Sequence, residues 1–387
     1  MTFVPRAIEP VVRRAARSFP AVLLTGPRRS GKTTLLRRLF PHAGYCLLED
    51  PDTVARVRAD PRSFLEELPQ PVILDEIQNA PELLNHVRSR IDRAPTRKGR
   101  WLITGSQEAP LMQGVTESMA GRAAILQLLP FSVLESPKVT LLKGGFPEVL
   151  ARPASRDLWF RSYVQTYLER DVRAVSSIRD LATFRRFLSL VASRFGQVLN
   201  KSDIAAPLGV SVPTVTEWLG ILEVTGQILL IPPFHENLGK RLIKSPKLYP
   251  VDSGLACHLL GIEDEKQLKR STFLGALFEG WVASEIIKSQ VNSGRRRELY
   301  FFRDQQGLEV DFMAPLPGGR IALMEAKAGA TIRPEDAEPI RRLSLALGKR
   351  EWRGFVVHQP VGQPDTSAVQ PGVKGISLPA LVGEMWR

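Results

Sequence analysis

The sequence has only two cysteines and no long apolar run, and both absences narrow what the protein can be. Cys46 and Cys257 lie in apolar surroundings, so we expect two reduced core residues rather than a disulfide or a metal-binding pair. The longest apolar runs, such as 21–24 and 228–231, fall far short of the roughly 20 residues that span a bilayer. Arginines interrupt the N-terminal stretch, which therefore lacks the apolar core of a signal peptide. We expect a cytoplasmic protein with no membrane partner.

Acidic residues are outnumbered, because 53 Lys and Arg face 40 Asp and Glu and leave a formal net charge of +13. Many of the cations are paired arginines, whose guanidinium groups suit bidentate contacts with phosphate. Such a surface favours a polyanionic partner, and we predict that this partner is DNA. A genome that uses arginine in place of lysine is the alternative explanation for the same charge.

The chain of 387 residues, 43% of them hydrophobic, is long enough for two or three separate cores. Residues 1–135 alternate strand-like and helix-like segments, which favours a parallel sheet with helices on both faces. Residues 136–245 are rich in helix-forming patterns and arginine, and residues 246–387 return to mixed α/β character. We therefore predict an α/β protein of three domains with these boundaries.

A phosphate-binding loop follows the first apolar strand. Residues 26–33 read Gly-Pro-Arg-Arg-Ser-Gly-Lys-Thr, which matches G-x-x-x-x-G-K-[ST] without a mismatch. The glycines let backbone N–H groups turn toward a β-phosphate, and the helix that begins at Lys32 adds its positive dipole end. Lys32 would reach the β- and γ-phosphates and Thr33 would ligate Mg²⁺, so ATP and Mg²⁺ are the expected cofactors. The predicted nucleotide-binding residues are Gly26, Pro27, Arg28, Arg29, Ser30, Gly31, Lys32, Thr33 and Thr34.

Two later strand-like segments end in polar residues. Asp75 and Glu76 follow an apolar run, and we predict that Asp75 holds Mg²⁺ through water while Glu76 polarises the attacking water. Ser106 and Gln107 follow the apolar segment 101–104, and side chains at such strand ends face the nucleotide crevice. One of these two residues is predicted to contact the γ-phosphate or the attacking water, and an ordinary turn is the alternative.

Gly121 and Arg122 precede a fifth strand-like segment, 123–128. Together with the phosphate loop and the acidic strand end, this order resembles the AAA+ ATPases. In that superfamily an arginine at the end of the fourth helix enters the neighbouring subunit's site. The resemblance implies that Arg122 is such a catalytic finger and that the chain self-associates, with a hexameric ring as one form. An exposed arginine at a helix end is also a favourable partner for the helix dipole.

The middle of the chain carries a helix-turn-helix signature. Residues 201–205 begin one helix, 208–211 form the turn and 212–219 form the second helix. The apolar run that follows suggests a wing, so the middle domain is predicted to combine a helical lid with a winged helix. The second helix of such modules enters the major groove, but Thr214 and Glu217 at its exposed positions carry no positive charge. Packing or oligomerisation is the alternative role.

The last domain holds carboxylates and a lysine at a recognisable spacing. Asp311 is predicted on one strand and Glu325 and Lys327 on the next, the latter two on one face because side chains alternate. Two carboxylates can hold a divalent metal, and a nearby lysine can stabilise developing charge. This D…E-x-K pattern is typical of restriction-endonuclease-like folds, with Glu279 as the helix acid. We therefore predict a second metal site at Glu279, Asp311 and Glu325, with Lys327 beside it; a solvated charged face is the alternative.

Nearly the whole chain resembles the prokaryotic AAA+-like ATPases that carry a C-terminal domain of unknown function with a nuclease-like fold. Beyond the ATP site and the C-terminal acids, the resemblance rests on residues 144–148, 169–172, 245–249 and 252–255. Members of that family usually carry Asn where this chain has Gln107. Whether Ser106 or Gln107 senses the γ-phosphate therefore stays open.

These observations predict a Mg²⁺-dependent ATPase that acts on DNA as an oligomer, for example by remodelling or translocating branched or damaged DNA. An ATP-gated DNA nuclease in defence is one alternative, motivated by the D…E-x-K residues. A nucleotide-switch scaffold that regulates other proteins is another, and its ATP hydrolysis would be slow and indifferent to DNA.

Overall fold

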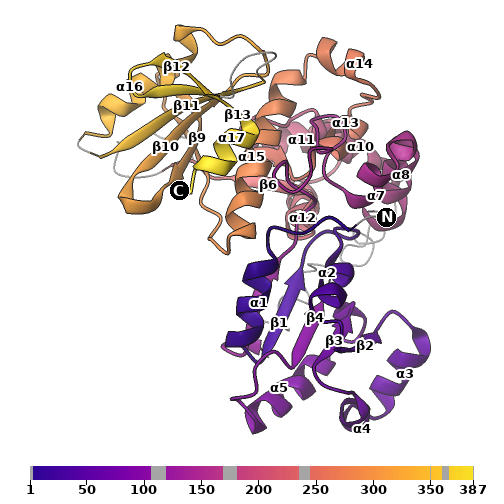
Figure 1. The fold of residues 1–387 in the computed structure, drawn as a ribbon. Helices are drawn as coiled ribbons and strands as arrows, with labels where there is room; N and C mark the ends of the chain where they lie inside the picture. Colours follow the sequence, from indigo (N-terminus) through magenta and orange to yellow (C-terminus); the bar gives the residue numbers. More distant parts are fainter. Residues whose placement is uncertain are drawn as a thin grey trace. The chain divides into compact units, whose positions relative to one another are not determined.

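The chain folds into two compact units (Figure 1). The first comprises residues 1–130 with two short later segments, 224–226 and 291–295, and the second comprises the rest. The helical middle of the chain and its C-terminal sheet therefore belong to one unit. The computed structural model describes residues 3–105, 119–168, 181–234, 245–348, 350–359 and 366–386.

The first unit is built on a five-stranded parallel sheet in the order β2-β3-β4-β1-β5. Strand β1 lies between β4 and β5, so the carboxyl ends of β3, β4 and β1 lie next to one another at one edge of the sheet. This arrangement confirms the predicted parallel sheet. The strands are β1 (Ala21–Thr25), β2 (Gly44–Leu47), β3 (Val72–Asp75), β4 (Trp101–Thr104) and β5 (Ala123–Gln127).

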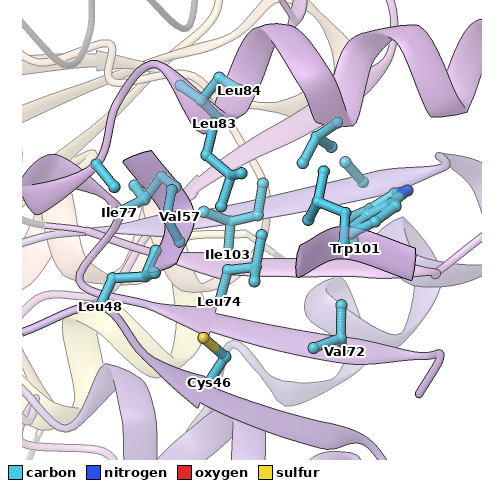
Figure 2. Packing of buried hydrophobic residues seen from close by; sticks show 14 of the residues in the cluster. Cys46, Leu48, Val57, Val72, Leu74, Ile77, Leu83, Leu84, Trp101 and Ile103 are labelled. Atoms are coloured by element: carbon cyan, nitrogen blue, oxygen red, sulfur yellow. The ribbon is translucent and has the colours of Figure 1, made fainter. Parts of the chain in front are cut away.

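Helices cover both faces of this sheet, as predicted. Successive residues of a strand point to opposite faces, and both faces of the buried strands are apolar. Ile73 packs in a cluster with apolar residues of α1 and α2, whereas Leu74 belongs to a cluster with α3, α4 and α5. Figure 2 shows part of the second cluster, where Leu83 of α5 reaches toward Leu74 and Ile103. The helices are α1 (Glu9–Ser18), α2 (Lys32–Leu39), α3 (Pro51–Ala59), α4 (Pro61–Glu67) and α5 (Leu83–Arg93).

The second unit begins with a helical part. Its α11 (Lys201–Leu208) and α12 (Val212–Val224) are the two helices predicted from the helix-turn-helix signature, and they meet at 111°. Gly209 ends α11 in the left-handed region at φ 66°, and Ser211 Oγ accepts the Thr214 N–H at 3.2 Å. The other elements here are α7 (Pro147–Ala151), α8 (Arg156–Tyr163), a π-helix (Val164–Leu168), α10 (Leu181–Ala192), α13 (Ser253–Leu259), α14 (Glu265–Arg270) and the antiparallel pair β6 (Ile228–Ile231) and β7 (Lys247–Pro250).

The second unit ends in a mixed six-stranded sheet in the order β12-β13-β11-β10-β9-β8. Strands β9 and β10 are antiparallel neighbours joined through a turn that contains Pro317, Gly318 and Gly319, which confirms the adjacency predicted for the strands of Asp311 and Glu325. The elements are α15 (Leu274–Asn292), β8 (Tyr300–Arg303), β9 (Glu309–Pro315), β10 (Ile321–Ala326), α16 (Glu338–Ala346), β11 (Trp352–His358), β12 (Thr366–Gln370), β13 (Val373–Ser377) and α17 (Leu378–Glu384).

Both cysteines are buried and free, as the composition predicts. Burial raises the pKa of Cys46 to about 11 and that of Cys257 to about 12, so neither thiol is poised to react. Among the described residues, no single helix is long and apolar enough to cross a membrane. In the part of the chain that the structure describes, α11 and α12 together, with a sharp bend between them, reach that length and composition.

Two glycine-containing segments of the family resemblance pack against each other around Asp252. The buried Asp252 carboxylate accepts the Gly145 N–H at 2.7 Å and the Leu255 N–H at 2.9 Å. A Cβ at Gly144 would lie 2.2 Å from Asp252 Oδ1, and one at Gly254 would collide with the facing backbone. The role of these residues is therefore to let two backbone segments approach and share one carboxylate. Burial raises the pKa of Asp252.

We predict that Asp252→Ala lowers the free energy of unfolding of the second unit by about 2–4 kcal/mol, because two buried N–H groups lose their acceptor. Urea denaturation of the full chain, followed by tryptophan fluorescence, measures this loss. Asp264→Ala is the matched control: its exposed carboxylate caps α14 by accepting the Gln267 N–H at 2.8 Å, and such caps contribute about 1 kcal/mol. Equal losses in the two variants would contradict the prediction.

Candidate active site at the phosphate loop

The loop between β1 and α2 has the backbone shape that phosphate binding needs. Gly26 has φ 138°, and a Cβ there would lie 2.1 Å from the Leu128 carbonyl oxygen, so only glycine fits. Gly31 has φ 96° and precedes Lys32 without any side-chain cap, which leaves N–H groups of the first helical turn for an anion. Arg29 and Thr34, two further residues of the predicted nucleotide site, are exposed.

Two buried polar groups of the loop fit a bound triphosphate. Ser30 Oγ is buried with no hydrogen-bond partner, a costly state that a phosphate oxygen would relieve. Lys32 is also buried, and its ammonium donates to the carbonyl oxygens of Gly26 at 3.0 Å and Pro27 at 2.9 Å. Phosphate oxygens would compete with these neutral acceptors for a charged donor. The residues predicted for the nucleotide therefore fit ATP.

Arg6 holds the phosphate loop in place, a role that the sequence did not predict. Its buried guanidinium donates to the Ser30 carbonyl oxygen at 2.9 Å and to the Leu129 carbonyl oxygen at 2.6 Å. It thus ties the phosphate loop to the chain just beyond β5. No local pattern distinguishes Arg6 from the other N-terminal arginines, since its role depends on a contact across more than a hundred residues of sequence.

Asp75 ends β3 and gathers hydroxyl groups from three elements. Thr33 Oγ1 lies 2.8 and 3.0 Å from its two carboxylate oxygens, Tyr45 OH donates to Oδ2 at 2.7 Å, and Thr104 Oγ1 donates to Oδ1. The predicted pair of Thr33 and Asp75 is therefore assembled, and these two residues would hold Mg²⁺. Sequence reasoning missed Tyr45 and Thr104, although the position of Thr104 at a strand end was a usable signal.

Glu76 follows Asp75 in a left-handed conformation, at φ 60° and ψ 52°, which is unusual for a residue other than glycine. Its backbone N–H donates to Thr104 Oγ1 at 3.1 Å. Its carboxylate accepts from Gln78 Nε2 and lies 3.9 Å from Arg28 Nη1. The structure therefore brings the predicted water-activating carboxylate to the sheet edge beside Asp75 and holds it there against its backbone preference.

Arg122 stands just before β5, as predicted, and is bound within its own unit. Its Nε lies 2.6 Å from Asp92 Oδ1 and its Nη2 lies 3.1 Å from Asp92 Oδ2, in a bidentate pair on the surface with α5. This pair lowers the pKa of Asp92. Ser106 and Gln107 lie outside the described residues, so their predicted contacts with the γ-phosphate or water stay predictions.

The predicted second metal site contains a lysine that the sequence did not indicate. Glu279 on α15, Asp311 on β9 and Glu325 on β10 do gather in one place, and Lys327 Nζ lies 3.6 Å from Glu325 Oε2. Burial and then Asp311 raise the pKa of both glutamates, that of Glu279 to about 7. The ammonium of Lys247, however, lies 3.0 Å from Glu279 and 3.7 Å from Asp311. Within the described ranges, no three acidic, histidine or cysteine side chains are arranged to hold a metal ion.

We predict that Tyr45→Phe raises the Mg²⁺ concentration for half-maximal ATP hydrolysis roughly fivefold, because Asp75 loses one hydrogen bond that orients it. Burial, and then the bond to Asp75, raise the pKa of Tyr45, so the hydroxyl stays a donor. ATP binding measured in EDTA should not change. Tyr300→Phe, which removes a tyrosine hydroxyl in the other unit, is the control. Identical Mg²⁺ titrations of both variants would show that Tyr45 does not position Asp75.

A match to a known family agrees with this site. A family described as AAA domain matches residues 18–136, which include the whole phosphate loop and Asp75. Two families described as domains of unknown function, DUF8612 and DUF4143, match residues 135–266 and 274–371. Among solved structures, the Walker-type ATPase PABY2304 of Pyrococcus abyssi is 17% identical, with 65% of this chain and 94% of that chain covered and a TM-score of 0.46.

Two curated relatives cover most of the chain. The uncharacterized proteins Rv2008c of Mycobacterium tuberculosis and Mb2031c of Mycobacterium bovis are each 34% identical over 314 residues, which span 79% of this chain and 70% of each relative. The AAA-domain match and the assembled phosphate loop together support ATP binding and hydrolysis. The chain belongs to the same family as these two mycobacterial proteins, and its own AAA-domain match and phosphate loop make it a P-loop ATPase.

Proposed function

We propose that the protein is a Mg²⁺-dependent ATPase that acts on DNA as an oligomer. The observation that carries the ATPase part is the assembly of Lys32, Thr33, Asp75 and Glu76 at one edge of the parallel sheet. Lys32 binds the phosphates, and Glu76 orients the attacking water and accepts its proton. Mg²⁺ held by Thr33 and Asp75 would neutralise charge on the phosphates.

The net charge of +13 and the geometry of α11 and α12 support action on DNA. Their angle of 111° lies in the range of helix-turn-helix motifs, about 90–120°. Helix α12 itself carries no lysine or arginine, so phosphate contacts would come from its surroundings. The exposed Arg186 of α10 is one such group, because it donates to the Pro207 carbonyl oxygen at 3.0 Å and so lies against α11.

Arg122 supports the oligomer part of the proposal. In the described part of the chain its hydrogen bonds run to Asp92 and to the Ala120 carbonyl oxygen. A solvent-exposed pair is easily exchanged for a stronger anion, and a triphosphate in a neighbouring subunit is such an anion. We therefore assign Arg122 to the site of the adjacent subunit.

We predict that duplex DNA binding weakens steeply with salt, with a log–log slope of about −0.9 for each phosphate contacted. Arg186→Ala should weaken binding and make the slope shallower by about one contact, whereas Arg56→Ala, which removes an exposed arginine paired with Glu67 on the first unit, should not. Fluorescence anisotropy across a salt series measures both. No binding at low salt, together with an ATPase rate indifferent to DNA, would favour a nucleotide-switch scaffold instead.

We also predict that mixing Arg122→Ala with Lys32→Ala partly restores ATP hydrolysis, although each variant alone is inactive. Mixed oligomers contain junctions where an intact site meets an intact finger, and arginine fingers contribute roughly 10³–10⁵ in rate. The control mixes Glu76→Gln with Lys32→Ala: both changes damage the same site, so every site stays damaged and no recovery is expected. Absence of recovery in oligomers shown to be mixed would reject a finger acting between subunits.

A further inference from the structure

Lys247 is the first residue of β7 and enters the carboxylate cluster of the C-terminal sheet. Its side chain is only 3% exposed, and its ammonium lies 3.0 Å from Glu279, 2.5 Å from Glu309 and 3.7 Å from Asp311. The ring of Phe301 lies 5.5 Å from the same nitrogen. One buried cation thus meets three carboxylates, which come from α15 and β9.

The surroundings of Lys247 favour its charged form. Burial alone would disfavour an ammonium, but the carboxylates of Glu279, Asp311 and Glu309 all lie within 4 Å of it and favour the charged form. The carboxylates in turn need the ammonium, because close carboxylates repel one another unless a cation lies between them. Lys247 therefore supplies the positive charge that this cluster of acids requires.

Several of the oxygen atoms that a metal would need are already used by donors. Asp311 Oδ2 accepts the Ala326 N–H at 3.0 Å, and its other oxygen faces Lys247. Glu279 Oε1 accepts from both Lys247 and the buried Tyr249 hydroxyl. These donors are backbone, tyrosine and lysine groups fixed by the packing of β7, α15 and β10. These donors satisfy Asp311 and one oxygen of Glu279 from within the protein.

Glu325 differs from Asp311, because one of its carboxylate oxygens has no donor and a cation could bind there. It is 4% exposed, and its Oε1 is buried with no hydrogen-bond partner, while Oε2 lies 3.6 Å from Lys327. Divalent cations such as Mg²⁺ and Ca²⁺ take about six or more oxygen ligands. One free buried oxygen does not provide such a site while Lys247 occupies the space between Glu279 and Asp311.

We propose that Lys247 is a built-in cation that takes the place of a divalent metal in this cluster, and that the C-terminal domain is for this reason not a metal-dependent nuclease. Lys247 acts as a fixed counter-ion that joins β7 to α15 and β9. This inference is independent of the ATPase and DNA-binding roles, since none of its residues belongs to the phosphate loop or to α11 and α12.

The test is Mn²⁺ binding without nucleotide, measured by electron paramagnetic resonance of the free ion. Wild-type protein should show no Mn²⁺ site that Asp311→Asn abolishes. Lys247→Ala should gain one site, at least tenfold tighter than any in the wild type, and adding Asp311→Asn should remove it. Mn²⁺ should also raise the melting temperature of Lys247→Ala, because a ligand that binds the folded state stabilises it.

Two further variants make the test specific. Lys247→Arg keeps the charge and should gain no Mn²⁺ site, and Lys327→Ala removes a more exposed ammonium that pairs with Glu325, so it should gain none either. Mn²⁺ binding by the wild type that disappears in Asp311→Asn would overturn the proposal, and this result does not depend on whether Lys247→Ala folds. A folded Lys247→Ala protein without a new site would overturn it as well.

Discussion

The carboxylate of Asp75 is the point on which the nucleotide-binding unit depends, because three strands and one helix meet there. It is 3% exposed, and Thr33, Tyr45 and Thr104 bring their hydroxyls to it from α2, β2 and β4. The strand order that places β2, β3 and β4 side by side makes this convergence possible. A buried carboxylate needs strong compensation, and hydroxyl groups supply only part of it. The remainder is what a bound Mg²⁺ would provide.

The buried carboxylates around Asp75 and around Glu279 and Asp311 have their negative charge compensated in different ways. Around Asp75 the partners are neutral hydroxyls, and the neighbouring Ser30 hydroxyl is left without a partner, so the site gains from a charged ligand. Around Glu279 and Asp311 the partner is the ammonium of Lys247, so the charge is balanced from within. The difference decides which centre is built to bind and which to hold strands together. Acidic residues alone, without their partners, do not distinguish the two.

The sequence predicted best what is local in the chain. Eight contiguous residues define the phosphate loop. The strand pattern alone was enough to place Asp75 and Glu76 at a strand end near this loop. Alternation also put Glu325 and Lys327 correctly on one face. Each of these inferences needs one or two neighbouring elements and no knowledge of the packing between distant ones.

Contacts between segments far apart in sequence were not predictable in the same way. Tyr45 is an ordinary residue of β2 until the pairing of β2 with β3 brings its hydroxyl to Asp75. Lys247 belongs to a short strand paired with β6, and nothing in its own pattern indicates that it ends among acids of α15 and β9. The D…E-x-K spacing therefore predicted that these acids lie together, but not that Lys247 lies among them.

Arg122 shows why such a contact does not by itself decide function. Its bidentate pair with Asp92 is exposed to solvent, where water and salt weaken attraction between charges. A triphosphate carries more charge than one carboxylate, so it attracts the same guanidinium more strongly. The free energy that Arg122 loses on leaving Asp92 is therefore small compared with the free energy gained by stabilising a phosphoryl transition state. The exposed pair with Asp92 is therefore compatible with the proposed role of Arg122 at the phosphate loop of another subunit.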